Sequence, residues 1–398
     1  MKILQIINRF PWPLKDGGAL GYFNFSKGYN DAGVDLTMAV LNTSKHFVEL
    51  EKLPPEVRQL ADIHLSYIDN RIKPFDALKN LLFSNESYHV VRFISQDFED
   101  LLVKLCSEKK FDVIVFESVF VTPYIDVVRK HSSAKCILRQ YNVEYEIWQS
   151  LAEIEKNSIK KWYLRVLSKR LKTFEIAQLN KFDGITCVTN QDAEVFKSLG
   201  CSKPIHVAPV GIDMKRLQPD NSQLEMPSLF HIGSMDWMPN QEAVVWFIEN
   251  VWQKLTIQFP ELKFYIAGRN MPDYFKKYHG GNIIVLGEVE DAIAFMQSKA
   301  IQIVPLFSGS GIRVKILEGM ALAKCIVTTP LGVQGIDAEN NKHLMIVNDA
   351  NSFIQAISLL INNPQKVIEM GTNAHELAKH KYDNKLITNQ TLDFYHNV

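Results

Sequence analysis

Residues 301–329 read IQIVPLFSGSGIRVKILEGMALAKCIVTT, and this stretch decides the fold. Its first four residues form a short apolar run, which is typical of a buried parallel strand. The glycines at 309 and 311 indicate a turn, and from Ile312 onward apolar residues recur at helical spacing. A second apolar run over residues 325–329 predicts the next strand. Strand, glycine loop, helix and strand in this order indicate a parallel α/β sheet.

The loop over residues 308–311 opens the predicted helix at the carboxyl end of a strand. Backbone N–H groups are free there, and the helix dipole favours an anion. Arg313 and Lys315 add positive charge to the first turn, where it opposes the dipole, so an anionic ligand would explain both. Glu318 lies about two turns into the helix and could accept hydrogen bonds from a diol such as a ribose. The alternative is a plain glycine turn followed by solvated charges.

Length and composition limit the class of protein. The 398 residues are enough for two domains of ordinary size, and 44 basic residues balance 44 acidic ones. The chain therefore has no net positive charge that would attract nucleic acid. Five widely spaced cysteines favour reduced thiols in the cytoplasm over a disulfide framework or a zinc site. The first apolar run is too short for a signal peptide, and none approaches the roughly 18 residues of a transmembrane helix.

The first half of the chain opens with a predicted βαβ unit. Gly17 and Gly18 lie at the amino end of its helix, where a phosphate can bind. The pair lacks the dinucleotide spacing Gly-x-Gly-x-x-Gly, and a tight turn is the simpler interpretation. Gly33 is expected to end this helix. Strands are predicted over residues 2–8, 34–41, 62–68, 112–116, 135–139, 183–189 and 204–208.

Polar residues follow the predicted strand over 135–139 directly. Ligands of open α/β sheets bind at the carboxyl ends of strands, which makes Tyr141 and Glu144 candidate site residues. The alternative is a loop in which Asn142 caps the next helix and Glu144 lies in its first turn.

Residues 156–172 contain seven basic residues and no acidic one. A basic amphipathic helix of this kind can lie on an anionic membrane surface. The alternative is a helix that packs its apolar stripe on its own domain and leaves its charges in solvent. The stripe consists of Ile159, Trp162, Tyr163, Val166 and Leu167.

The alternation of strands and helices restarts after a polar stretch. Residues 209–227 are the predicted linker between a first domain over 1–208 and a second over 228–375. Residues 376–398 are predicted to be a helical tail that packs back on the first domain. Two doubly wound α/β domains facing across a cleft are expected, and the cleft is the default ligand site. Besides the two strands of the opening stretch, strands are predicted over residues 228–232, 262–267, 282–286 and 344–347.

These segments together resemble the retaining glycosyltransferases of family 4, which have the GT-B fold of two Rossmann-like domains. The resemblance covers nearly the whole chain and is nearest to a bacterial branch whose loop reads Gly-Ser-Gly-x-Arg-x-Lys-x-Leu-Glu. It rests on the Gly17-Gly18 loop, VAPVGID at 207–213, FHIGSM at 230–235, YIAG at 265–268, VLGEVED at 285–291 and the opening stretch.

The chain departs from the family pattern at three places. Glu318 matches the second Glu of the family's Glu-x7-Glu motif, but Ser310 stands where the first is expected. The Arg and Lys that many members carry after the first strand of the second domain are absent. Relatives often have a His at the position of Tyr141. The resemblance implies that backbone N–H groups of the glycine loop replace the first carboxylate, and that Arg313 and Lys315 bind the diphosphate.

The resemblance implies transfer of a hexose, with retention, from a nucleoside-diphosphate sugar to a glycan or lipid-linked acceptor in bacterial surface polysaccharide or glycoconjugate synthesis. No metal or other cofactor is expected, because two fixed cations would supply the charge. The expected location is cytoplasmic, with residues 156–172 available for the inner face of the plasma membrane. The implied catalytic residues are Arg313, Lys315, Tyr141 and Glu144. The implied donor-binding residues are Gly17, Gly18, Gly233, Ser234, Gly268, Arg269, Gly287, Val289, Gly309, Ser310, Gly311 and Glu318.

Other functions stay open at this point. Two Rossmann-like halves could hold a nicotinamide dinucleotide, although neither glycine loop has the required spacing and no acidic residue is placed for the ribose. A sugar epimerase with the GT-B fold would need no acceptor. A non-catalytic nucleotide-sugar-binding protein would explain the missing first Glu.

Overall fold

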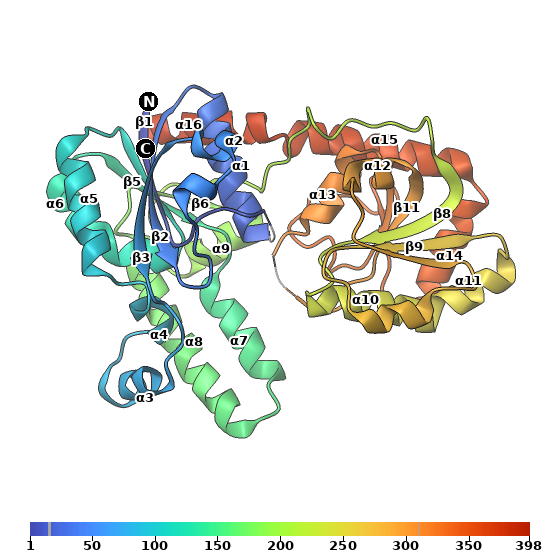
Figure 1. Ribbon diagram of the computed structural model, residues 1–398, viewed down its shortest axis with the longest axis horizontal. Coiled ribbons are helices and arrows are strands. Elements are labelled where there is room, and N and C mark those ends of the chain that lie inside the picture. Colours follow the sequence, from blue (N-terminus) through green and yellow to red (C-terminus); the bar gives the residue numbers. More distant parts are fainter. Residues whose placement is uncertain (15–16, 310) are drawn as a thin grey trace. The chain divides into compact units, whose positions relative to one another are not determined.

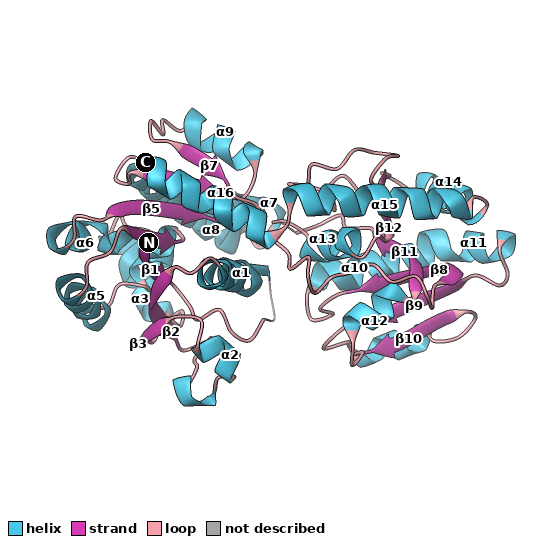
Figure 2. Ribbon diagram, turned by 90° about the horizontal axis from the view of Figure 1, so that it is seen from above, coloured by secondary structure: helices cyan, strands magenta, loops and turns pink. Residues whose placement is uncertain are grey.

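The computed structural model describes residues 1–14, 17–309 and 311–398, and the chain forms two compact units (Figure 1). The first unit holds Met1–Pro209 together with Ile387–Val398, and the second unit holds Val210–Leu386. Each unit is built on one parallel β-sheet, and Figure 2 shows helices packed on both faces of each sheet. The second unit is therefore inserted into the first along the chain.

The first unit has a seven-stranded sheet in the order β3-β2-β1-β4-β5-β6-β7. Successive strand residues face opposite sides, so Leu4 and Ile6 enter one core while Ile3 and Ile7 enter the other. Its strands are β1 (Lys2–Ile7), β2 (Asp35–Thr43), β3 (Asp62–Ile68), β4 (Val113–Glu117), β5 (Lys135–Gln140), β6 (Gly184–Cys187) and β7 (Ile205–Val207). Its helices are α1 (Gly17–Asp31), α2 (Pro55–Arg58), α3 (Pro74–Phe83), α4 (Tyr88–Val91), α5 (Gln96–Glu108), α6 (Ile125–His131), α7 (Glu144–Ile154), α8 (Ser158–Leu179) and α9 (Asn190–Ser198), joined by most of α16 (Asn384–Asn397).

The second unit has a six-stranded sheet in the order β10-β9-β8-β11-β12-β13. Leu229 and Phe230, neighbours in β8, enter the cores on its two opposite faces. Its strands are β8 (Glu225–Ile232), β9 (Lys263–Ala267), β10 (Ile283–Gly287), β11 (Lys299–Val304), β12 (Cys325–Thr328) and β13 (Met345–Ile346). Its helices include α10 (Met238–Phe247), α11 (Gln253–Gln258), α12 (Ala292–Gln297), α13 (Val314–Ala321), α14 (Ala350–Ile361) and α15 (Pro364–Lys381).

The thirteen predicted strands are all present, with ends that differ by at most three residues. Gly33, with φ of +74°, ends α1 in the left-handed conformation, as predicted.

The division of the chain differs in detail from the predicted one. Ile212 and Leu217, placed in the predicted linker, lie in a core of the second unit. Tyr382 belongs to the same core, and its hydroxyl accepts a hydrogen bond from the Asp337 N–H at 2.8 Å. The C-terminal segment therefore joins the first unit only from Ile387. There the Tyr395 hydroxyl lies 2.9 Å from that of Tyr29.

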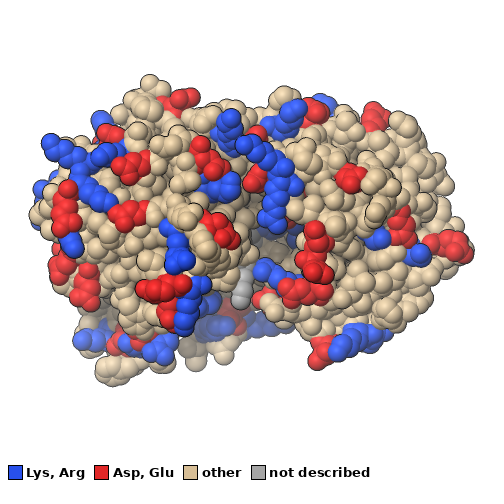
Figure 3. Space-filling view, turned by 45° about the horizontal axis from the view of Figure 1, so that its top comes forward, with Lys and Arg blue, Asp and Glu red and all other residues tan. Residues whose placement is uncertain are grey.

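The cysteines, the helices and the surface charges can be compared with what the composition predicts. All five cysteines are free. No helix among the described residues combines the length and the apolar character that a bilayer crossing requires. Figure 3 shows basic and acidic side chains interspersed over the surface it displays. On this displayed face neither sign of charge forms a continuous patch.

Candidate functional site

The loop between β11 and α13 lies where the strand order of the second sheet reverses, because β8 is flanked by β9 on one side and β11 on the other. Ligands of open α/β sheets bind at the carboxyl ends of the strands at such a point. The prediction that the helix begins at Ile312 is wrong by two residues, since α13 begins at Val314. Arg313 has non-helical angles (φ −86°, ψ 86°) and directly precedes the helix, whereas Lys315 lies in its first turn.

Gly309 and Gly311 give this loop its shape. Their φ angles of +98° and +82° lie in the left-handed region that favours glycine. A Cβ on Gly309 would also lie only 2.7 Å from the ring of Trp237. Ser308 donates a hydrogen bond to the Glu242 carboxylate of α10 at 2.8 Å, which holds the start of the loop. Ser310, an expected donor-binding residue, lies outside the described residues.

Lys315 is the polar centre of the site. Its Nζ donates a hydrogen bond to Asn240 Oδ1 at 2.6 Å and lies 3.4 Å from His231 Nε2. The other ring nitrogen of His231, Nδ1, is 2.9 Å from the Ile303 carbonyl oxygen and donates to it, which leaves Nε2 as an acceptor. Burial and the charge of Lys315 lower the pKa of His231 well below its ordinary value, so this ring is neutral.

The ammonium group of Lys315 is poorly solvated, and little opposite charge lies near it to compensate its own. It forms no ion pair with any residue that the structure describes. Burial, together with the charge of Arg313, lowers the pKa of Lys315 to about 7. A bound anion would restore the charged form. This lysine is therefore prepared to bind an anion, which is what its place at a helix amino end also suggests.

The turn after β8 makes room for Lys315. Gly233 has no side chain, and a Cβ there would lie 2.7 Å from Lys315 Nζ and 2.8 Å from Asn240 Nδ2. Asn240 Nδ2 donates to the Ser234 carbonyl oxygen at 2.8 Å, so one amide joins this turn to the lysine. The Ser234 hydroxyl donates to Asp236 at 2.6 Å. The structure thus brings two of the predicted donor-binding residues, Gly233 and Ser234, next to Lys315.

Arg313 supplies a second cation beside the loop. Its side chain is almost fully buried, with 4% of the residue exposed. Nη1 donates to the Gly311 carbonyl oxygen, and the guanidinium lies 5.6 Å from the centre of the Trp237 ring. Burial lowers the pKa of Arg313 to about 10, so the group still carries its charge at neutral pH.

Glu318 lies one helical turn beyond Lys315 on α13. Its carboxylate makes no hydrogen bond or ion pair within the described ranges 1–14, 17–309 and 311–398. Burial raises the pKa of Glu318, and the charges of Arg216 and Lys315 oppose that shift. A partly exposed carboxylate without a partner is free to accept hydrogen bonds from ligand hydroxyls.

The loops after β9 and β10 complete this edge of the sheet. The Gly268 N–H donates to the Gly287 carbonyl oxygen at 2.7 Å, and the Met235 N–H donates to the Arg269 carbonyl oxygen at 2.8 Å. Gly268 has φ of +155°, and a Cβ there would collide with the Gly233 carbonyl oxygen at 1.8 Å. The predicted residues Gly233, Gly268, Arg269 and Gly287 therefore gather at one sheet edge, with Val289 two residues beyond.

In the first unit Tyr141 belongs to a buried polar network. Its hydroxyl donates to Glu117 Oε2 at 3.0 Å and accepts from Arg139 Nε at 3.1 Å. The second oxygen of Glu117 accepts from Gln5 Nε2 at 2.7 Å, and Arg139 lies 3.6 Å from Glu117 over the ring of Phe25. Within this network the Tyr141 hydroxyl positions two buried charges.

Tyr141 also packs against α1. Its ring meets that of Tyr22 edge to face, with 4.7 Å between centroids. Gly21 leaves space for it, since a Cβ there would lie 2.7 Å from the Tyr141 ring. Gly17 and Gly18 occupy the first turn of the same helix, as predicted.

Glu144 is the first residue of α7, and a second carboxylate approaches the same helix end. Asn142 does not cap the helix as the alternative interpretation expected, because Val143 is the capping residue and its side chain makes no cap bond. The carboxylate of Glu175 in α8 caps the helix instead, because it accepts hydrogen bonds from the N–H groups of Glu144 (3.1 Å) and Tyr145 (3.2 Å). Burial raises the pKa of Glu144 to about 7, and burial with the charge of Glu144 raises that of Glu175 to about 8.

Sequence reasoning missed four polar residues of these two sites. His231 follows an apolar run at a strand end, which is a recognisable position, but Asn240, Glu117 and Glu175 stand in stretches with no local signal. Each of these three reaches its partner across 22 to 75 residues of chain: Arg139 for Glu117, Tyr145 and Glu144 for Glu175, and Lys315 for Asn240.

Part of the second unit matches a known protein family. Residues 226–363, which contain the second-unit site, match the family described as Glycosyl transferases group 1. Over 97% of its length the chain is 22% identical to an uncharacterized 44.6 kDa protein in the cps region of Klebsiella pneumoniae, of which it also covers 97%.

Solved structures share the architecture of the whole chain. Sucrose-phosphate synthase from Thermosynechococcus elongatus superposes with a TM-score of 0.70 at 13% identity, covering 100% of this chain and 99% of that one. HepE from Anabaena, crystallised with UDP, gives a TM-score of 0.66 at 14% identity with 100% of both chains covered. The predicted fold class, an α/β chain of two doubly wound Rossmann-like domains of the GT-B type, is confirmed.

Proposed function

We propose that this chain is a retaining glycosyltransferase of family 4. It moves a hexose from a nucleoside-diphosphate sugar to a glycan or lipid-linked acceptor, in the synthesis of bacterial surface polysaccharide or glycoconjugates. The observation that carries the proposal is the cluster of Arg313, Lys315 and Glu318 around the amino end of α13, inside the segment that matches the glycosyltransferase family. The HepE structures solved with UDP and with UDP-glucose support a nucleotide sugar as the donor.

The proposed donor site uses charge and backbone together. The diphosphate lies at the amino end of α13, where the N–H groups of the glycine loop and the helix dipole favour an anion. Lys315 and Arg313 neutralise the charge that grows on the diphosphate as it leaves, and such preorganised groups lower the barrier most. Glu318 accepts hydrogen bonds from the ribose hydroxyls. No metal is needed in this scheme, because the two cations take its place.

The proposed acceptor side lies in the first unit. Glu144 has a pKa of about 7 and can exchange a proton with a hydroxyl near neutral pH. Tyr141 presents its ring beside α1 and keeps its hydroxyl on Glu117 and Arg139. We place the reaction in the cytoplasm, where five free thiols remain reduced.

A thermal-shift screen tests this proposal. We expect one nucleoside diphosphate, with or without its sugar, to stabilise the protein by about 2.7 kcal/mol at 100 times its Kd. EDTA should leave the shift unchanged. NADH serves as the contrasting ligand, and a shift with NADH but with no nucleoside diphosphate would favour an oxidoreductase. Release of the nucleoside diphosphate only when acceptor is present separates transfer from epimerisation and from binding alone.

The Glu318→Gln variant tests the ribose contact. Glutamine keeps the shape but removes the charge, so a charged hydrogen bond of about 1.5–3 kcal/mol is lost and donor affinity should fall about 10-fold or more. Turnover should fall as well. Isothermal titration with the identified nucleotide and steady-state kinetics measure the two effects. The control is Glu249→Gln at an exposed position of the same unit. Equal donor affinity in Glu318→Gln and wild type would show that Glu318 does not bind the ribose.

A further inference from the structure

Helix α3 exposes an apolar face that the rest of the first unit leaves uncovered. Phe75 and Phe83 are 77% and 81% exposed, and Leu78 and Leu82 are more than half exposed. Residues 75, 78 and 82 lie on one side of a helix because their spacing is three and four. Ala77, on the other side, is buried against the unit. Single exposed apolar residues are ordinary, but four on a ten-residue helix form a patch.

The amino end of α8, a helix that contacts α3 further along its length, exposes more apolar residues. Arg170 of α8 donates to the carbonyl oxygens of Asn80 (3.2 Å) and Leu81 (3.0 Å), so the two helices are in contact. Ile159 and Trp162 of α8 are 79% and 56% exposed. Figure 1 shows α3 and the joined ends of α7 and α8 projecting on the same side of the first unit. The apolar patch consists of Phe75, Leu78, Leu82, Phe83, Ile154, Ile159 and Trp162.

The basic amphipathic helix predicted from the sequence is present, but only half of its stripe is packed. Leu167 is buried in a small cluster with Ala77 and Tyr88, and Tyr163 lies at the edge of that cluster. The stripe therefore packs on its own unit at its carboxyl end, while its amino end stays in solvent. The domain itself thus explains half of the stripe and leaves the other half for an external partner.

Positive charge surrounds the apolar patch. The exposed residues Lys156, Lys160, Arg165 and Lys169 belong to the stretch 156–172, which has no acidic residue. Arg71 and Lys73 precede α3, where Asp69 pairs with both at 2.8 Å and 3.4 Å. Lys160 pairs with Glu155 at 2.5 Å, so three of these six cations form ion pairs, whereas Lys156, Arg165 and Lys169 form none among the described residues. A partner that matches this surface is apolar inside and negative at its edge.

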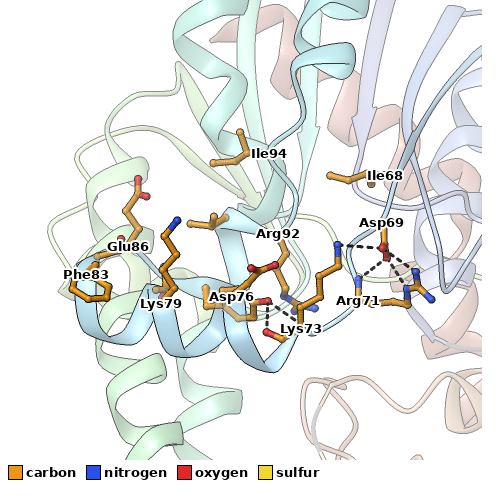
Figure 4. Close-up of a pocket in the computed structure, with 14 residues that line it drawn as sticks. Ile68, Asp69, Arg71, Lys73, Asp76, Lys79, Phe83, Glu86, Arg92 and Ile94 are labelled. Carbon is orange, nitrogen blue, oxygen red and sulfur yellow. Dashed lines mark hydrogen bonds and ion pairs between the residues drawn. The ribbon is translucent and has the colours of Figure 1, made fainter.

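A pocket of about 430 Å³ opens beside α3 (Figure 4). Lys79 extends from α3 into this pocket, and Arg92 also lines it. Neither cation forms an ion pair among the residues that the structure describes, although Arg92 Nη1 donates to the Asn70 carbonyl oxygen at 2.8 Å. The carboxylates of Asp76 and Glu86 also line the pocket. A phosphate group held between Lys79 and Arg92 would gain charge-assisted hydrogen bonds.

We propose that the apolar patch docks the first unit on an anionic lipid bilayer. The apolar faces of α3 and of the joined ends of α7 and α8 lie in the interfacial layer, and the surrounding cations contact lipid phosphates. A bilayer is the occupant that matches all three observations: uncovered apolar helix faces, positive charge around them, and a pocket lined by Lys79 and Arg92, which form no ion pair within the described residues. The proposal does not depend on the enzymatic activity, although a lipid-linked acceptor would be presented at the same surface.

Vesicle sedimentation of the full chain tests this docking. We expect binding to vesicles of phosphatidylcholine with phosphatidylglycerol, weak binding to phosphatidylcholine alone, and loss of binding as salt rises. The double variant Phe75→Ser, Phe83→Ser should bind at least about tenfold more weakly, because two large apolar side chains no longer enter the lipid. The variant Arg165→Glu, Lys169→Glu should lose most of the preference for the anionic lipid.

The control is Ile257→Ser, since Ile257 is 81% exposed but lies in the second unit. It should bind vesicles like the wild type. All these residues are exposed, so the melting temperatures of the variants should match that of the wild type and exclude misfolding. Equal, negligible binding to both kinds of vesicle at low salt would overturn the proposal. So would sedimentation equilibrium showing a dimer that the Phe75→Ser, Phe83→Ser variant dissociates, because the patch would then hold a second copy.

Discussion

Replacing Lys315 by methionine should lower kcat by about 10²–10³, the usual loss when one preorganised charge-stabilising donor is removed. Methionine has nearly the length of lysine and fills the same space. The ammonium group interacts most strongly with the departing diphosphate, so the loss should appear in kcat and in KM together. The ligand-free melting temperature should stay level or rise slightly, because a poorly solvated charge at the amino end of α13 is gone.

The pH dependence of donor binding gives an independent measure of the same residue. The pKa of Lys315 is about 7 in the ligand-free chain, because the amine is buried near Arg313. A diphosphate favours the protonated amine, so binding takes up a proton above pH 7. Affinity should be full below pH 7 and should fall by up to about tenfold for each further pH unit. Isothermal titration in two buffers of different ionisation enthalpy should detect the proton in wild type and not in Lys315→Met.

The matched control is the Lys324→Met variant. Lys324 is also buried, and burial lowers its pKa to about 8. Its amine donates to the carbonyl oxygens of Gln297 (2.9 Å) and Lys299 (3.3 Å), so its role is structural. Lys324→Met should therefore lose stability and keep donor affinity. If Lys315→Met retains activity within about threefold, or is destabilised as much as Lys324→Met, the assignment of Lys315 to the diphosphate is wrong.

The Glu117→Gln variant should lose about 3–5 kcal/mol of stability, the typical cost of removing one partner of a buried ion pair. Glu117 and Arg139 are 0% and 1% exposed, and glutamine would leave the guanidinium without a counterion. Glutamine also puts an amide N–H₂ where a carboxylate oxygen accepts from the Tyr141 hydroxyl. Urea denaturation followed by tyrosine and tryptophan fluorescence measures the loss.

Two further variants isolate the pair. In Glu225→Gln the partly exposed ion pair with Lys299, at 2.6 Å, is broken instead, and the loss should be at most about 1 kcal/mol. The double variant Glu117→Leu, Arg139→Met removes both charges and should recover much of the stability, since apolar residues often replace a buried pair without cost. A loss below about 1 kcal/mol in Glu117→Gln would show that Arg139 keeps its charge without Glu117.

Apolar runs in the sequence were sufficient to locate the strands, because both faces of each sheet are buried. Continuous apolar runs such as Val113–Phe116 predict parallel strands wherever they occur, and the glycines between them mark the turns. The glycine loop and the cations after β11 could also be found, since they follow one another in the sequence. The start of α13 could not, because the conformation of Arg313 depends on a loop packed against Trp237.

The polar networks depend on strand register and helix packing. In the sequence Glu117 only ends an apolar strand. Its partner is defined by the pairing of β4 and β5, whose register sets Glu117 opposite Arg139. Glu175 caps α7 from another helix, and the sequence next to Glu144 offers only Asn142 as a capping residue. Asn240 meets Lys315 across 75 residues of chain. Such contacts follow from tertiary structure, and a single sequence carries no local sign of them.

The order of synthesis has a consequence for the inserted second unit. Residues 387–398 are translated after all of Val210–Leu386, yet Ile387 and Tyr395 belong to the core beneath β1. On the ribosome the second unit can fold from a continuous stretch, while the first unit still lacks the part of its core that α16 supplies. Tyr29 of α1 and the apolar side chains of β1 belong to the core that α16 completes, and a chaperone can bind this region until α16 emerges.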